Sequence, residues 1–289
     1  MWFIVFTILL HLLVIFPVIL YRKMSKVYLN ERVPHSKTPA ELKIPFSEIR
    51  IPTKNDKSLY AWWIPVNELT AESFPTLILV HGWNRNVERL LVYIRELYGR
   101  GFNLIAFDAR HHGSSDTDEY ASMPKFAEDI QSVIDYLQDE LHSGLDGLAV
   151  VGLSIGGAAS IYAASQDFRI KKVVTVGAFA HPEDVMRSEF RKHYIPYFPL
   201  VWLLFRKMQK VIGLTFEKVA PVNNIHNSPA DFLIIHGEKD DVVPAGDAHR
   251  LAAAGNPKRV SVWIIAGRGH SDCHREFGFW DRILNFLKK

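Results

Sequence analysis

Short apolar runs alternate with segments of helical spacing from the middle of the chain to its C-terminus. The apolar runs are rich in β-branched residues and have the length of strands buried on both faces of a parallel sheet. They lie at 76–80, 103–107, 148–151, 172–176, 232–235 and 261–265. Helices are predicted between them, at 87–98, 122–141, 158–164, 245–253 and after Cys273. This alternation predicts an α/β fold with one doubly wound, mostly parallel sheet.

The segment that begins near residue 122 shows the helical pattern most clearly. Ser122 is the expected N-cap, because its hydroxyl can accept a hydrogen bond from a free N–H of the first turn, where Pro124 is also tolerated. The apolar side chains that follow have the spacing of one helix face. They are Phe126, Ile130, Val133, Ile134, Leu137 and Leu141.

Two segments depart from the alternation. Residues 46–51 and 59–65 alternate enough to predict an antiparallel pair at a sheet edge, joined by a turn at 54–57. Residues 181–221 are too many for one crossover helix between two strands, so they predict an inserted helical cap. Within the cap, residues 194–205 are dense in aromatic and aliphatic side chains, which either roof a pocket or touch a bilayer.

The N-terminus is almost wholly apolar over residues 2–20, interrupted by Thr7, His11 and Pro17. As a helix this stretch would span about 28 Å, close to the roughly 30 Å hydrocarbon core of a bilayer. A cleaved signal peptide would need a basic start, a shorter apolar stretch and a small-residue cleavage site, none of which is visible. The sequence therefore favours a transmembrane anchor at 1–21.

Basic residues follow this stretch directly, at Arg22, Lys23 and Lys26. By the positive-inside tendency they predict that the rest of the protein is cytoplasmic. The prolines and charges of the next residues predict a linker at 22–45, followed by the main domain at 46–289.

Composition narrows the function classes. The chain has 289 residues, a formal net charge of +3, 48% hydrophobic and 22% charged residues, which is ordinary globular composition. It has no polybasic block, so nucleic acid is not a predicted partner. With Cys273 as its single cysteine, the chain has no internal disulfide.

The motif Gly-Leu-Ser-Ile-Gly at 152–156 lies between a predicted strand and a predicted helix. Such a turn brings the backbone close to its neighbours, which explains Gly152 and Gly156 on either side of Ser154. A serine hydroxyl becomes nucleophilic when an imidazole takes its proton and a carboxylate orients that imidazole. Asp240 and His270 follow later predicted strands, in the order Ser, Asp, His.

These motifs together resemble the α/β-hydrolase superfamily, and most closely its membrane-anchored serine esterase, lysophospholipase and monoacylglycerol-lipase-like branch. The resemblance runs from about residue 46 to the C-terminus. It implies that Ser154 is the nucleophile, His270 the base and Asp240 the acid. It also implies an oxyanion hole made by the backbone N–H groups of Trp83 and Ile155, and no metal or organic cofactor. The motifs are His-Gly at 81–82, residues 108–115, residues 152–156, residues 237–244 and Gly-His at 269–270.

Several residues are alternatives for these roles. Asp241, next to Asp240, and Asp184, after the preceding strand, are the other candidate acids. His274 is a weaker candidate base, because it is predicted to belong to the final helix. His81 and His236 each precede a glycine at a strand end, where a structural role is favoured.

Two further groups of polar residues call for an interpretation. Asp108, Arg110, His111 and His112 are predicted to order the loop after their strand. The Cys and His residues after His270 raise the question of a metal, but their spacing does not give a convincing ligand set.

The sequence predicts a membrane-anchored serine hydrolase that cleaves a lipophilic carboxylic ester through an acyl-enzyme. A lipid bilayer is its expected partner. The same residues can serve a thioesterase, including one acting on acylated proteins, or a peptidase. A catalytically silent membrane adaptor is the non-enzyme alternative, but it would not need a complete Ser, Asp and His set.

Overall fold

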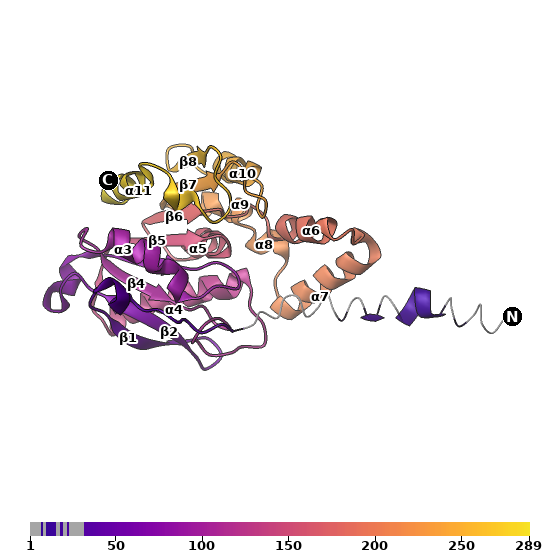
Figure 1. Ribbon diagram of the computed structural model, residues 1–289, viewed down its shortest axis with the longest axis horizontal. Helices are drawn as coiled ribbons and strands as arrows, with labels where there is room; N and C mark the ends of the chain where they lie inside the picture. The colour runs from indigo at the N-terminus through magenta and orange to yellow at the C-terminus, as the bar shows by residue number, and fades with distance from the viewer. Residues whose placement is uncertain (1–6, 8–9, 16–17, 20–21, 23–31) are drawn as a thin grey trace.

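A single sheet forms the centre of the protein in the computed structural model, which describes residues 7, 10–15, 18–19, 22 and 32–289. Its strands are β1 (Ser47–Thr53), β2 (Lys57–Ile64), β3 (Pro75–Val80), β4 (Asn103–Phe107), β5 (Gly144–Leu153), β6 (Lys172–Val176), β7 (Asp231–Gly237) and β8 (Val260–Ile265). The order across this eight-stranded sheet is β1-β2-β4-β3-β5-β6-β7-β8 (Figure 1). Strand β2 is antiparallel to β1 and β4, and the other neighbours are parallel. The predicted mostly parallel sheet with an antiparallel edge pair is confirmed.

Helices cover both faces of this sheet, as predicted for a doubly wound fold. One face packs against α4 (Met123–Asp139), α5 (Ile155–Gln166) and α10 (Gly246–Ala254). The other face packs against α3 (Leu91–Leu97) and α11 (Phe279–Lys288). Short helical turns connect these elements: η2 (Pro39–Leu42), η3 (Glu68–Ser73), η4 (Val87–Leu90), α9 (Pro221–Asn224), η6 (Ile225–Asn227) and η7 (Cys273–Arg275).

The central strands are apolar on both sides because each face has its own core. In β3, Leu77 and Leu79 belong to one core and Ile78 and Val80 to the other, and all four side chains are fully buried. This is the alternation of side chains expected along a strand. Burying such a side chain contributes roughly 1.5–3 kcal/mol, so the two cores hold the sheet between the helices.

Helix α4 begins where its sequence predicts. The Ser122 hydroxyl accepts a hydrogen bond from the Lys125 N–H at 3.4 Å, and Pro124 lies in the first turn. The predicted helix at 87–98 instead divides into the 3₁₀ turn η4 and the α-helix α3. The Val87 N–H at its start donates to the Asp108 carboxylate at 2.6 Å, which ties this turn to the loop after β4.

Between β6 and β7, the helical segments that precede α9 stand away from the sheet and lie within the predicted cap at 181–221 (Figure 1). They are α6 (Pro182–Lys192), η5 (Tyr197–Val201), α7 (Trp202–Ile212) and α8 (Phe216–Val219). The cap has a small core of its own, so it is more than a loop laid over the body. Its buried side chains are Phe190, Val201, Leu204, Phe205 and Phe216.

The membrane anchor predicted at 1–21 falls mostly outside the described residues. Within the described part of the chain, no helix is both long and apolar enough to cross a bilayer. The predicted linker at 22–45 is described at residue 22 and from residue 32 onward. Its second half packs on the body: Ile44 is buried in the core that faces α3, and the Ser36 hydroxyl and N–H donate to Glu88.

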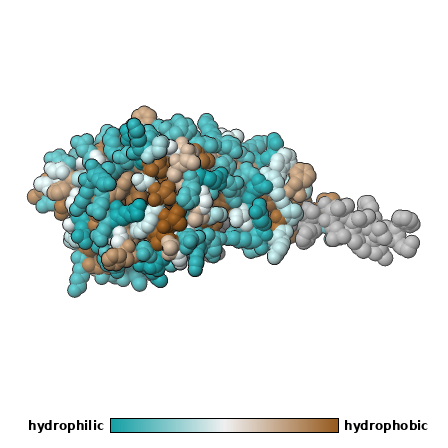
Figure 2. Space-filling model, turned by 90° about the horizontal axis from the view of Figure 1, so that it is seen from above, coloured by the Kyte–Doolittle hydropathy of each residue, from teal (hydrophilic) through white to brown (hydrophobic). Residues whose placement is uncertain are grey.

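Hydrophilic side chains cover most of the face in Figure 2, and hydrophobic ones gather near its middle. Such a mixture is normal, because folded proteins keep a large share of apolar atoms on their surface.

Candidate active site

Ser154 lies on the turn between β5 and α5, in an uncommon backbone conformation. Its φ is 53° and its ψ is −120°, and residues other than glycine rarely adopt such a positive φ. The Ser154 N–H donates to the Val176 carbonyl at 2.8 Å, which holds the turn against the neighbouring strand. Strained backbone of this kind persists only where the surrounding structure holds it in place.

The glycines of the motif allow this turn, as its sequence predicts. A Cβ at Gly152 would collide with the carbonyl group of Gly156 across the turn. A Cβ at Gly156 would lie 2.5 Å from the His81 carbonyl oxygen. Both glycines are therefore required by close backbone contacts.

His270 and Asp240 meet Ser154 at this edge of the sheet. His270 Nε2 lies 3.0 Å from Ser154 Oγ, and His270 Nδ1 lies 2.7 Å from Asp240 Oδ2. Because the carboxylate accepts, Nδ1 carries the proton there and Nε2 is free to accept from the serine hydroxyl. The residues follow β5, β7 and β8, so three strand ends bring them together.

The Asp240 side chain is fully buried and well supplied with donors. Its Oδ1 accepts from the N–H groups of Val242 and Val243 at 2.9 and 2.8 Å, and its Oδ2 lies 3.1 Å from His236 Nε2. Burial alone would raise the pKa of Asp240. The hydrogen bonds from His236, His270 and Val243 outweigh burial and hold this pKa well below its usual value.

The contact between His236 and Asp240 is not predicted from the sequence. His236 is fully buried at the end of β7, and its Nε2 also lies 2.9 Å from the Val243 carbonyl oxygen. Both neighbours are acceptors, so Nε2 carries the proton. In the sequence, the spacing of four residues between His236 and Asp240 is the signal that could have indicated this contact.

The alternative acids lie elsewhere. Asp241 is exposed, and its carbonyl accepts from Lys192. Asp184 is in α6 of the cap, where its carboxylate accepts from Arg250 at 2.8 Å. Neither carboxylate is hydrogen-bonded to His270 in the described structure, whereas Asp240 is.

The other candidate histidines lie apart from the contact between Ser154 and His270. His274 lies in the short turn η7, not in the final helix as predicted, because the chain turns again before α11 begins at Phe279. His81 is fully buried and its Nε2 accepts from the Ala109 N–H at 3.0 Å, while burial lowers its pKa. Cys273 is a free, buried cysteine, and burial raises the pKa of its thiol to about 12.

The backbone predicted to form the oxyanion hole lies beside the serine. A Cβ on Gly82 would come within 3.4 Å of the Ser154 Cβ, so the segment leading to Trp83 is close to Ser154. Ile155 is the first residue of α5, where an N–H has no acceptor within the helix. Trp83 and Ile155 both line a cavity that also contains Ser154.

Two cavities meet at Ser154. The larger has a volume of about 550 Å³ and lies between the body and the cap. Its lining is mostly apolar and includes Met123, Phe179, Met186, Leu204, Met208 and Phe216. The smaller has a volume of about 230 Å³. Its lining combines the polar residues His270, Arg85, Arg89 and His274 with apolar ones such as Leu153 and Val176.

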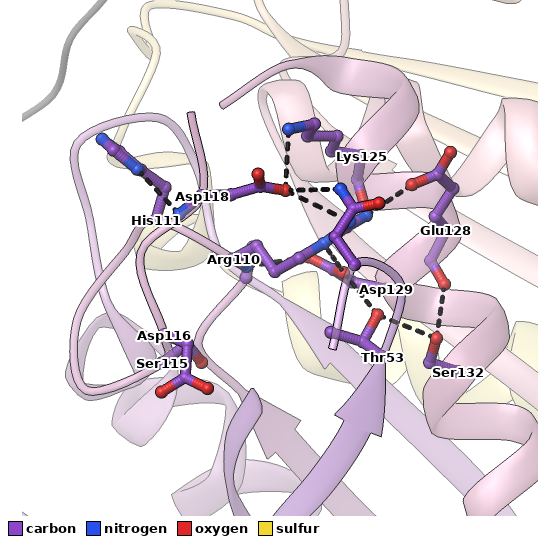
Figure 3. Close-up of polar contacts among 12 residues, drawn as sticks. Thr53, Arg110, His111, Ser115, Asp116, Asp118, Lys125, Glu128, Asp129 and Ser132 are labelled. Carbon is purple, nitrogen blue, oxygen red and sulfur yellow. Dashed lines mark hydrogen bonds and ion pairs between the residues drawn. The ribbon is translucent and has the colours of Figure 1, made fainter. Parts of the chain in front are cut away.

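The loop after β4 is held by a separate group of mostly buried charged side chains, which we call the Arg110 cluster (Figure 3). Its members are Arg110, Asp118, Lys125, Glu128 and Asp129. The Arg110 side chain is fully buried and donates from Nε to Asp129 at 2.6 Å and from Nη2 to Glu128 at 2.5 Å. The predicted role of Arg110 in ordering this loop agrees with these contacts.

Asp108 and His112 also belong to this loop, as expected. The Asp108 carboxylate accepts from the N–H groups of Val87 and Ser114, at 2.6 and 2.7 Å. Burial lowers the pKa of His112 to about 3. Across the described residues, no group of three or more His, Cys, Asp and Glu side chains is arranged to hold a metal ion.

The arrangement has the components of nucleophilic acyl transfer. A serine hydroxyl lies next to an imidazole, the imidazole is oriented by an ionised carboxylate, and amide groups lie near the place where an oxyanion would form. Such a set can attack the carbonyl carbon of an acyl compound that is bound at the junction of the two cavities.

Comparison with known proteins agrees with this fold. The chain is 24% identical over 259 residues to membrane protein YNL320W of Saccharomyces cerevisiae, covering 88% of this chain and 83% of that one. It is 23% identical over 175 residues to the thiohydrolase aneE of Aspergillus aculeatus, covering 57% of this chain and 52% of that one. The esterase Pf2001 of Pyrococcus furiosus superposes with a TM-score of 0.71 at 21% identity, over 90% of this chain and 98% of its own.

The family model described as the alpha/beta hydrolase family matches residues 77–277. This range includes the serine turn, the acid and the histidine, together with the whole cap. The chain belongs to the alpha/beta hydrolase family.

Proposed function

We propose that this protein is a serine hydrolase that cleaves a carboxylic ester with a lipophilic acyl group. The single observation that carries this proposal is the hydrogen-bonded series from Asp240 through His270 to Ser154, at the junction of two cavities. In this proposal Ser154 is the nucleophile, His270 the general base and Asp240 the orienting acid.

The reaction has two halves. Ser154 Oγ attacks the carbonyl carbon and its proton passes to His270 Nε2, while the amides of Trp83 and Ile155 stabilise the oxyanion. The bond to the leaving oxygen then breaks, and that oxygen takes the proton from His270. Water attacks the acyl-enzyme, gives its proton to His270, and Ser154 recovers a proton as the acid departs.

The acyl group is assigned to the larger cavity. Its size and mostly apolar lining suit a hydrocarbon chain, and its place beneath the cap keeps such a chain out of water. A thioester is the second candidate substrate, since the same attack opens both bonds. It is favoured by the likeness to a thiohydrolase.

Labelling with a fluorophosphonate probe tests the nucleophile. The wild-type chain is expected to be labelled at Ser154, and Ser154→Ala to lose all labelling. The Ser160→Ala variant is the matched control, because Ser160 lies on the same helix with its hydroxyl bonded to the Gly156 carbonyl. Labelling that persists in Ser154→Ala would refute the mechanism.

An acyl-chain series tests the substrate class. We expect kcat/KM for p-nitrophenyl esters to rise from acetyl to octanoyl, and Met208→Trp to shift the optimum toward shorter chains by filling the cavity. Oxygen esters and thioesters of one chain length are compared in parallel. A sharp preference for acetyl esters would contradict the lipophilic assignment.

Membrane attachment through the apolar N-terminus is part of this proposal. It is supported by the hydropathy of residues 2–20 and by a relative whose name describes a membrane protein. The full chain should resist extraction from membranes by alkaline carbonate, and the body should be accessible to protease from the cytoplasmic side. Release by carbonate, or protection of the body in sealed inside-out vesicles, would contradict the anchor or its orientation.

A further inference from the structure

The smaller cavity differs in chemistry from the larger one. Arg85, Arg89 and His274 line it, and none of its described lining residues is an aspartate or a glutamate. The two cavities share Ser154, Trp83 and Val242, so a substrate bound at the serine extends into both.

The position of His270 decides which half of an ester enters which cavity. His270 lines the smaller cavity but is absent from the described lining of the larger one. In acyl transfer the leaving oxygen takes its proton from the imidazole, so it must come within hydrogen-bond reach of Nε2. The leaving alcohol therefore occupies the smaller cavity, and the acyl chain occupies the larger.

The two arginines that line the smaller cavity differ in their surroundings. Arg85 is exposed, and Arg89 donates from Nη2 to the Ser271 carbonyl at 2.7 Å. The nearby carboxylates are engaged elsewhere: Glu88 accepts from Ser36, and Asp272 accepts from the Gly269 N–H at 2.7 Å.

Positive charges lie near His274. Burial lowers the pKa of His274, and the charges of Arg89 and Arg275 lower it further, whereas the charge of Asp272 raises it. A bound anion would offset the positive charges of Arg85 and Arg89, and guanidinium groups match phosphate oxygens in geometry.

On the basis of the ester hydrolysis proposed above, we propose that the substrate's leaving group is an alcohol carrying a phosphate-type anion, bound by Arg85 and Arg89. The volume of about 230 Å³ suits a small phosphorylated alcohol. Hydrolysis then releases a free acid from the larger cavity and the phosphorylated alcohol from the smaller. A phosphorylated thiol, as in an acylated phosphopantetheine, presents the same anion.

Substrates that differ only in phosphate test this assignment with the full chain in detergent micelles. One pair is 1-oleoylglycerol and 1-oleoylglycerol 3-phosphate, and the other is oleoyl pantetheine and oleoyl 4′-phosphopantetheine. We expect the phosphorylated member of one pair to have a kcat/KM about 10–100-fold higher, as charged hydrogen bonds give. The pair that shows the preference identifies the source of the phosphate.

Variants then assign the preference to the arginines. The ratio of kcat/KM within the preferred pair should fall below about 3-fold in the Arg85→Gln/Arg89→Gln double variant, which removes both charged donors. It should persist in Arg95→Gln, a control on helix α3 whose side chain is 59% exposed. Equal values within both pairs, or a preference that survives the double variant, would overturn the proposal.

A measurement on the wild-type chain makes the test independent of variant folding. Glycerol 3-phosphate or phosphopantetheine should inhibit p-nitrophenyl octanoate hydrolysis at least 10-fold more strongly than its unphosphorylated counterpart. Equal inhibition by the phosphorylated and the unphosphorylated compound would overturn the phosphate assignment but not the proposed ester hydrolysis. Absence of p-nitrophenyl octanoate hydrolysis and of fluorophosphonate labelling would overturn the proposed function as well.

Discussion

Two clusters of charged side chains lie at the carboxyl ends of the strands, and they differ in their donors and in their access to solvent. At the serine, Asp240 is surrounded by two imidazoles and backbone N–H groups, and the cluster opens onto both cavities. In the Arg110 cluster, Asp129 is paired with a guanidinium group, and both side chains are fully buried.

The difference explains what each cluster can do. An imidazole held by a carboxylate can accept and return a proton, which is what catalysis at Ser154 requires. The Arg110 guanidinium keeps its charge at any physiological pH, so its ion pairs can fix a loop but cannot relay a proton. A buried carboxylate can therefore support catalysis when its partner is an imidazole, and can stabilise a loop when its partner is a guanidinium group.

The largest expected effect comes from removing the charge next to His270. Asp240→Asn should reduce kcat by about 10³–10⁴-fold, because the imidazole loses the group that sets its tautomer and stabilises its positive charge. Steady-state kinetics on p-nitrophenyl octanoate measure this. The neighbouring exposed residue supplies the control, since Asp241→Asn should retain activity within a few-fold. A larger loss in Asp241→Asn than in Asp240→Asn would reassign the acid.

A smaller effect, on stability rather than on chemistry, is expected in the Arg110 cluster. Arg110→Met leaves Asp129 buried without its partner, which should lower the free energy of unfolding by about 3–5 kcal/mol. Denaturation in urea measures this change. Arg95→Met, at an exposed pair with Glu96, should change it by less than about 0.5 kcal/mol. Equal effects of the two substitutions would show that the Arg110 cluster does not stabilise the fold.

The smallest effect concerns pH. The pKa of Asp240 is lower in the folded chain than the usual value near 4, so its contribution to stability is full above about pH 4 and is lost as pH falls below it. The free energy of unfolding of the wild type should therefore fall more steeply with acid than that of Asp240→Asn, by up to about 1.4 kcal/mol per pH unit. Urea titrations from pH 6 to pH 3 test this, with Asp241→Asn as the control. Parallel slopes in wild type and Asp240→Asn would contradict it.

Much of the fold follows from local patterns. The predicted strand at 172–176 has its observed bounds, because its three buried valines form the kind of β-branched run that is typical of a strand inside a parallel sheet. Strand β5 begins earlier than its apolar run, at Gly144, since backbone pairing with Pro75 does not need an apolar side chain. Boundaries of this kind depend on the neighbouring strand and not on the residue itself.

The sequence by itself determined the α/β alternation, the turn at Ser154 and the order of the three residues that now lie within hydrogen-bonding distance. These are properties of single strands and of the loops that follow them. Only the tertiary structure decided that His236 supports Asp240, that Arg85 and Arg89 face the same cavity as His270, and that an apolar cavity lies on the other side of Ser154. Such relations join segments far apart in the chain, and packing alone brings those segments together.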